Sequence, residues 1–86
     1  MDGDVPELVI DASPNPASSF FTVEWQSNLS GPVTIEMYNL VGTKIYSITD
    51  ATSGSIQLGN ELTAGMYFIH IKQGSEEKII KVIKQN

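Results

Sequence analysis

The chain has 86 residues, which is enough for one small domain and leaves no room for a second hydrophobic core. It contains no cysteine, so disulfide bonds, thiolate metal sites and a cysteine nucleophile are excluded. Ten acidic residues against five lysines and no arginine give a net charge of −5, which argues against a nucleic-acid-binding protein, because such proteins present a basic face.

We expect neither a membrane-spanning helix nor an N-terminal signal peptide in this sequence. No apolar run approaches the roughly 20 residues of a membrane-spanning helix. The acidic start, Met1-Asp2-Gly3-Asp4, lacks the basic residues and apolar stretch of a signal peptide. Residues 1–7 are therefore predicted to be a linker or a cloning-derived segment, and residues 8–86 the folded domain.

The first predicted strand, residues 8–10, leads into a stiff corner. This corner, Ser13-Pro14-Asn15-Pro16, contains two prolines that each fix φ, lack an N–H donor and push the preceding residue towards extended geometry. A trans peptide bond is expected before each proline, because the cis form is the minority one. The corner is predicted to hold the chain rigidly as it enters the next strand.

The second predicted strand, residues 20–26, alternates with period two. Phe21, Val23 and Trp25 share one face, as expected of a strand with one buried side. A tryptophan in register with Phe and Val is expected in the core, and a carbohydrate-stacking role is the alternative.

The middle of the chain predicts a β-hairpin over residues 33–49. Strands at 33–39 and 44–49 flank a turn in which Asn39 suits the first position, since its side chain can bond the backbone two residues on. Gly42 suits the last position, where φ can be positive. A short strand at 55–58 follows.

The last two predicted strands, 66–72 and 76–84, are joined at Gln73-Gly74-Ser75. The final strand is apolar on both faces: Ile80 and Val82 share one face with Lys78 and Lys84, and Ile79 and Ile83 lie on the other. Lysines on the face of Ile80 and Val82 conflict with its full burial. We therefore expect this strand to be exposed or covered by a partner.

About seven short strands and no convincing helix predict an all-β fold, a single immunoglobulin-like antiparallel β-sandwich. The residues expected to face inward are Phe21, Val23, Trp25, Val33, Ile35, Met37, Ile45, Tyr67, Ile69, Ile71, Ile80 and Val82.

The sequence offers no catalytic or metal-binding constellation. His70 is the only histidine, and it has no second ligand nearby. No serine lies in a Gly-x-Ser-x-Gly motif, and no glycine motif for phosphate is present. Glu76 and Glu77 point to opposite faces of a strand and cannot act as paired acids. We expect no enzymatic activity, no catalytic residues, no metal and no cofactor.

Four segments resemble the type A C-terminal sorting domains of the type IX, or Por, secretion system. They are Pro14-Asn15-Pro16, Val33 to Gly42, Leu62 to Ile69 and Lys78 to Lys84, and they match in order and spacing. Asn39 stands where the family often has Asp, and Thr43 where a basic residue is common. The resemblance implies a seven-stranded immunoglobulin-like fold and makes residues 8–86 the sorting domain.

The resemblance also implies a role as an export tag at the C-terminus of a larger cargo protein. The cargo would reach the periplasm by its own signal peptide and pass through the outer-membrane translocon to the cell surface or the extracellular space. A surface sortase would remove the tag and attach the cargo to lipopolysaccharide. The implied partners are the translocon, the sortase and the cargo in cis, with no nucleic acid and no membrane span.

Two sets of residues carry the site hypothesis. The candidates for recognition by translocon or sortase are Lys78, Ile79, Lys81, Ile83 and Lys84; the structural motif residues are Pro14, Asn15, Pro16, Asn39, Gly42, Gly65 and Tyr67. Tyr67 is expected in the core with its hydroxyl bonded near the surface. The terminal lysines either face solvent without a role or present a basic edge to the translocon.

Two other functions stay open at this point. The domain is a carbohydrate-binding or adhesive module if Trp25, Tyr38, Tyr46 and Phe68 form exposed stacking rings. It is a spacer if it has no partner.

Overall fold

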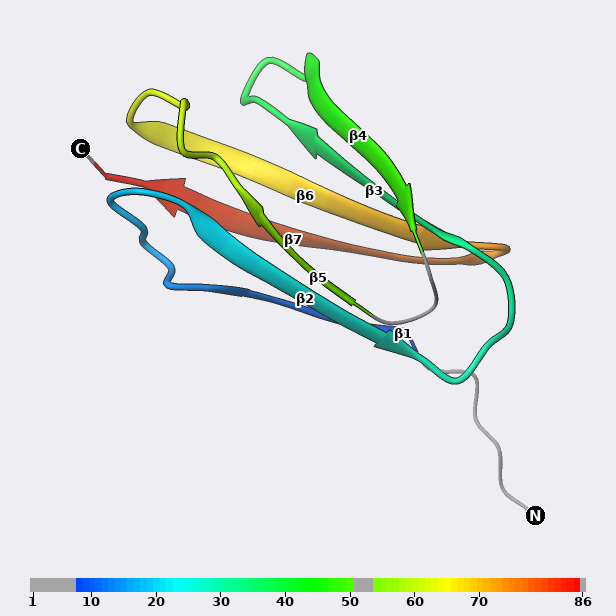
Figure 1. Ribbon diagram of the computed structural model, residues 1–86. Helices are drawn as coiled ribbons and strands as arrows, with labels where there is room; N and C mark the ends of the chain where they lie inside the picture. Colours follow the sequence, from blue (N-terminus) through cyan, green and yellow to red (C-terminus); the bar gives the residue numbers. More distant parts are fainter. Residues whose placement is uncertain (1–7, 51–53, 86) are drawn as a thin grey trace.

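The structure is a computed structural model that describes residues 8–50 and 54–85, and within these ranges all regular structure is β (Figure 1). The predicted all-β sandwich is confirmed: seven strands form two antiparallel sheets. The strands are β1 (Leu8–Ser13), β2 (Phe21–Ser27), β3 (Val33–Tyr38), β4 (Lys44–Asp50), β5 (Gly54–Leu58), β6 (Gly65–Gln73) and β7 (Glu76–Lys84). The predicted linker, residues 1–7, lies outside the described residues.

Sheet A has the strand order β1-β2-β5, and sheet B has the order β4-β3-β6-β7. The β6–β7 hairpin is tighter than predicted, because Gln73 pairs with Glu76 and leaves a two-residue turn. Gly74 takes the positive φ of 59° in that turn, which glycine adopts without strain.

The inner faces of the two sheets supply the core, as the period-two pattern predicts. The predicted core residues that are buried are Phe21, Val23, Trp25, Val33, Ile35, Met37, Tyr67, Ile69, Ile71 and Val82; Ile80 is partly buried against them. Leu8, Ala12, Ala17 and Leu58 complete the core and were not predicted. Burial of a Trp, Phe or Ile side chain contributes about 1.5–3 kcal/mol each, so this core is the main source of stability.

The prediction that Ile45 is a core residue is wrong, since it is 38% exposed. The cause is a β-bulge: Met37 pairs with Tyr46, but Tyr38 pairs with Lys44, which leaves Ile45 unpaired. A bulge redirects the extra residue relative to the regular alternation.

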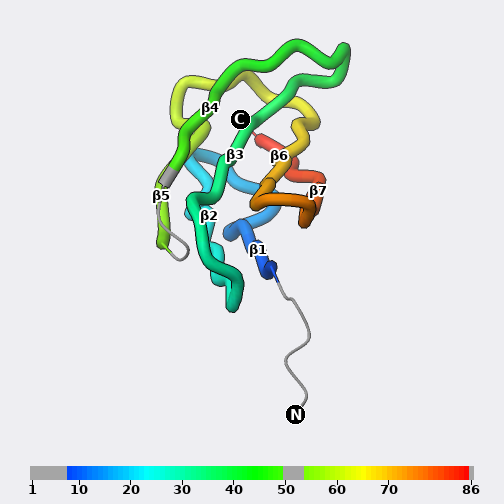
Figure 2. Tube along the Cα trace, turned by 90° about the vertical axis from the view of Figure 1, so that its right-hand side faces the viewer, coloured from blue at the N-terminus to red at the C-terminus, as the bar shows by residue number. Residues whose placement is uncertain are grey.

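The proline corner takes the chain from β1 of sheet A to the edge of sheet B, before β2 returns it to sheet A. Before it, β1 pairs with β2 in sheet A; after it, Ala17 forms a parallel bridge with Lys84 of β7 in sheet B. Both the Ser13–Pro14 and the Asn15–Pro16 peptide bonds are cis, contrary to the trans geometry expected. β1 packs next to β7, and Figure 2 shows both strands on the same side of the sandwich.

Gln73 is a buried polar residue at the end of β6, 3% exposed. Its Nε2 donates to Gly31 O at 2.8 Å and to Leu29 O at 3.2 Å, and its Oε1 accepts a hydrogen bond from the Ser27 hydroxyl. These bonds satisfy the buried amide and fix the β2–β3 loop against the hairpin.

Candidate functional site

The two faces of β7 differ in exposure. On the outer face, Ile79 is 60% exposed and Ile83 36%, and Lys81 is exposed between them. On the inner face, Val82 is fully buried and Ile80 is partly buried. Lys78 is exposed near the hairpin turn. The structure thus brings four of the candidate recognition residues to the surface of one strand.

Lys84 is the exception, because it is only 3% exposed. Its ammonium group donates to three backbone carbonyls of the β5–β6 loop: Gly59 O at 2.6 Å, Leu62 O at 3.0 Å and Asn60 O at 3.4 Å. The expectation that Lys84 lies at an exposed or partner-covered end is wrong. A long side chain can bury its stem and still satisfy its charge, which the strand pattern alone does not reveal.

Asn15 covers the outer edge of β7. Its Nδ2 donates to Lys81 O at 3.0 Å, and its Oδ1 accepts from Ile83 N at 2.9 Å. The side-chain amide therefore bonds β7 as the backbone of a neighbouring strand would. The sequence predicted a stiff corner at this position but not its target, which is 66 residues further along the chain.

Ala17 continues this cover with backbone hydrogen bonds. Ala17 N donates to Ile83 O at 2.9 Å, and Gln85 N donates to Ala17 O at 2.7 Å. The C-terminal half of the β7 edge is thus paired rather than open. Pairing removes the row of free backbone groups that makes an edge strand prone to aggregation.

The other motif residues shape turns or anchor the core. Asn39 Oδ1 accepts from Val41 N at 3.1 Å and from Thr43 N at 2.9 Å, which is the side-chain-to-backbone turn expected of Asn. Gly42 has a φ of 90° and Gly65 a φ of 156°, both strained for other residues. The buried Tyr67 donates its hydroxyl to Thr63 O at 2.8 Å, as predicted.

A charged network that the sequence pattern did not reveal lies on the outer face of sheet B, across β4, β3 and β6. Glu36 is 6% exposed; its carboxylate accepts from the Tyr38 hydroxyl at 2.9 Å and from Lys44 Nζ at 3.2 Å, and lies 3.4 Å from Lys72 Nζ. One feature of the sequence could have predicted the central position of Glu36: the period-two alternation of its strand. In the sheet, Glu36 lies opposite His70 on one side and Ser47 on the other.

The network shifts the ionisation of its members. The hydrogen bond from the Tyr38 hydroxyl lowers the pKa of Glu36 below its usual 4.5, and the hydrogen bond from Lys44 is the next largest cause. The Glu36 carboxylate in turn raises the pKa of Tyr38 and of Lys44. Nearby on the same face, His70 Nε2 lies 3.5 Å from Glu77 Oε2.

The four rings of the carbohydrate-binding alternative do not share a surface. Trp25 is buried in sheet A, and Tyr46 is paired with the buried Met37 on the inner side of sheet B. Tyr38 and Phe68 are half-buried partners on its outer face. This separation leaves no row of stacking rings.

The described ranges, 8–50 and 54–85, hold neither a metal cluster nor a membrane-spanning helix. In those ranges no three His, Cys, Asp or Glu side chains come together as a metal site. No helix there is long and apolar enough to cross a membrane.

Four segments carry the family resemblance: Pro14 to Pro16, Val33 to Gly42, Leu62 to Ile69 and Lys78 to Lys84. In the structure Asn15 of the first bonds to β7, and β6 pairs with both β3 and β7. A search of curated proteins found none that matches the chain. A sequence profile of the family described as "Secretion system C-terminal sorting domain" matches residues 12–85, almost the whole chain. The chain therefore belongs to the family of C-terminal sorting domains of the type IX secretion system.

Proposed function

We propose that this domain is a non-catalytic export signal that directs a larger cargo protein through the outer-membrane type IX translocon. Residues 1–7 are the linker to the cargo, and residues 8–86 are the signal. A cell-surface sortase removes the domain and joins the cargo to lipopolysaccharide. The single observation that carries the proposal is the family match over residues 12–85.

The outer face of β7 is the proposed recognition surface. Ile79 and Ile83 expose apolar area there, and Lys81 adds positive charge between them in a chain whose net charge is −5. The exposed Lys78 lies on the opposite face, near the hairpin turn. Exposed apolar side chains beside a cation offer a protein partner both area and orientation. Lys84 has a different role: its bonds to the β5–β6 loop anchor the strand and hold this surface in place.

The export test fuses residues 1–86 behind a reporter with its own signal peptide, in a bacterium that has this secretion system. We expect the reporter at the cell surface, without the tag and shifted to lipopolysaccharide-linked forms on gels. A strain lacking the translocon is the control, and there the reporter stays in the periplasm. Periplasmic retention in the intact strain, beside normal export of an established tag, contradicts the proposal.

The recognition surface is tested with Ile79→Asp. Ile79 is exposed on the outer face of sheet B, and the matched control is Val9→Asp, because Val9 is 47% exposed on β1 of the other sheet. Neither change touches the core, so both variants should keep the melting temperature. We expect at least tenfold less surface reporter for Ile79→Asp and unchanged export for Val9→Asp. Equal export of the two variants rules out this face as the recognition surface.

A further inference from the structure

We propose that the free edge of β4, together with the pocket beside it, binds an extended segment of another protein, which adds to sheet B as a fifth strand. The segment has an apolar side chain that enters the pocket and a lysine or arginine that pairs with Glu61. This site is separate from the outer face of β7, and its occupant is a polypeptide strand rather than a small molecule.

The first observation is the direction of the backbone groups of β4. Ile83 bonds outward to Asn15 and Ala17, so its amide and carbonyl point away from β6. Backbone direction alternates along each strand, and the register from β7 through β6 and β3 then points Ser47 and Thr49 away from β3. β4 is an outermost strand, so these groups lie at the free edge of sheet B.

The second observation is that residues 45–49 lack the usual protection of an edge strand. The segment reads Ile-Tyr-Ser-Ile-Thr, which is uncharged, free of proline and rich in β-branched residues. Natural edges normally carry lysines, prolines or a covering segment. The bulge at Ile45 protects one end of β4, and the regular part that follows it can pair with a further strand.

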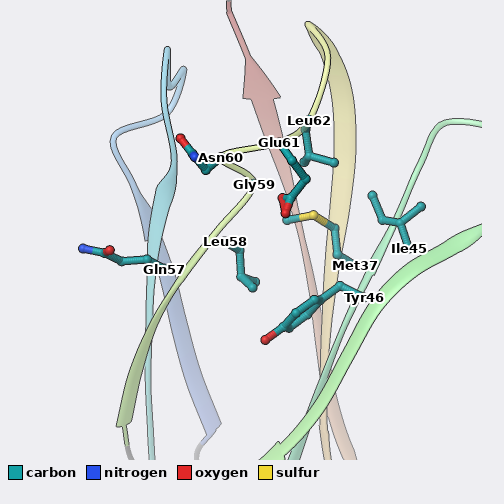
Figure 3. A pocket seen from close by; sticks show the side chains of 9 residues that line it. All are labelled: Met37, Ile45, Tyr46, Gln57, Leu58, Gly59, Asn60, Glu61 and Leu62. Carbon is teal, nitrogen blue, oxygen red and sulfur yellow. The ribbon is translucent and has the colours of Figure 1, made fainter.

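The third observation is a pocket of about 360 Å³ between β4 and the β5–β6 loop (Figure 3). Its apolar wall comes from Met37, Ile45, Tyr46, Leu58 and Leu62. Tyr46 and Ile48 face inward but are only half-buried. A strand paired with β4 would point every second side chain to the inner side of sheet B, because side chains alternate between the faces of a sheet, and the one beside Tyr46 would lie over this pocket.

The negative charge at the pocket favours a positively charged segment as the added strand. The exposed Glu61 lines the pocket. Figure 3 shows its side chain extending from the β5–β6 loop toward the other lining side chains. No described lining residue is a cation. The net charge of −5 disfavours a second copy of this chain and favours a cationic segment.

The probe is an acetylated, amidated peptide, Thr-Val-Thr-Phe-Thr-Lys-Thr-Val, titrated into the 15N-labelled chain and followed by NMR. We expect saturable shifts confined to residues 46–49 and 57–62, with slowed hydrogen exchange at the Ser47 and Thr49 amides. A companion peptide with Glu in place of Lys should bind at least fivefold more weakly.

Variants at two positions test the two parts of the site. Ser47→Pro removes the outward N–H without breaking a bond to β3, and we expect at least tenfold weaker binding; Ser47→Lys keeps that N–H and should bind within about threefold of the unchanged chain. Glu61→Lys should reverse the preference between the two peptides. Retained binding by Ser47→Pro or an unreversed preference overturns the proposal.

Three further outcomes also overturn it: no saturable shift up to 2 mM peptide, shifts confined to β7, or concentration-dependent shifts at β4 without peptide, which would make the occupant a second copy. The experiment uses purified chain, so its failure leaves the export role untouched. Failure of export likewise leaves the peptide result standing.

Discussion

Sheet B has two edge strands, β7 and β4, and they differ in how their free backbone groups are covered. β7 is covered along its C-terminal half by Asn15 and Ala17 and anchored by the buried Lys84. β4 has a bulge at Ile45 but an uncharged run after it, and it borders a pocket instead of a covering segment. The two strands therefore offer different groups to a partner: β7 exposes side chains on its outer face, and β4 exposes backbone groups along its edge.

Two of the buried polar side chains among the described residues hold the β6–β7 hairpin in place. The described residues Gln73 and Lys84 each bind backbone carbonyls of a loop, one near either end of the β6–β7 hairpin. Asn15 adds a third contact, a hydrogen bond to the edge of β7. The hairpin is thus held at three places, which keeps the outer face of β7 in one geometry.

The largest expected effect is that of Lys84→Met. The substitution keeps most of the buried stem but removes the charged donor from three loop carbonyls, so the free energy of unfolding should fall by about 2–4 kcal/mol. Lys81→Met, three residues earlier on the exposed face, should change it by less than about 0.5 kcal/mol. Urea denaturation of both variants measures the difference. Equal stabilities would show that the Lys84 bonds contribute nothing.

The next effect comes from proline on each edge. Ile83→Pro removes the N–H that donates to Asn15 and should cost about 2 kcal/mol, whereas Ser47→Pro removes an N–H that points to solvent and should cost less than about 1 kcal/mol. Thermal unfolding followed by circular dichroism compares the two. A larger loss for Ser47→Pro would mean that the β4 edge is already paired.

A smaller effect is expected for Asn15→Ala, which leaves the β7 edge with one free carbonyl and one free amide. Both groups are accessible to water, so the loss should be about 1 kcal/mol. Hydrogen exchange at the Ile83 amide should become faster while the Val82 amide is unchanged. Unaltered exchange at Ile83 would contradict the role of Asn15 as an edge cover.

The smallest expected effect on stability is the loss of the Glu36 contribution at acidic pH. Its folded pKa lies below the unfolded value near 4.5, so the carboxylate contributes stability that is present above pH 4.5 and is lost as the pH falls through the folded value. Glu36→Gln should cost about 1 kcal/mol at pH 7, and the cost should shrink steadily as the pH is lowered below 4.5. A series of denaturation curves from pH 7 downward measures this, and a cost that does not change over the whole acid range in which the chain stays folded rules out the ionised network as the cause.

The strands, most of the core and the family follow from the order of the amino acids alone. Period-two alternation identified Phe21, Val23 and Trp25 as one buried face. Side chains of a strand alternate between two faces, and the apolar face is the one that packs into the core. Asn39 and Gly42 specified their turn through local chemistry. These features depend on neighbours within a few residues, which the sequence places side by side.

Features that depend on distant partners emerged only once the chain was folded. The burial of Lys84 requires the carbonyls of the β5–β6 loop, and the target of Asn15 requires β7 to lie against the proline corner. The exposure of Ile45 requires a shift in the pairing of β3 with β4. Hydrogen bonds and register between segments far apart in the chain set these three outcomes, and alternation within one strand carries no information about either.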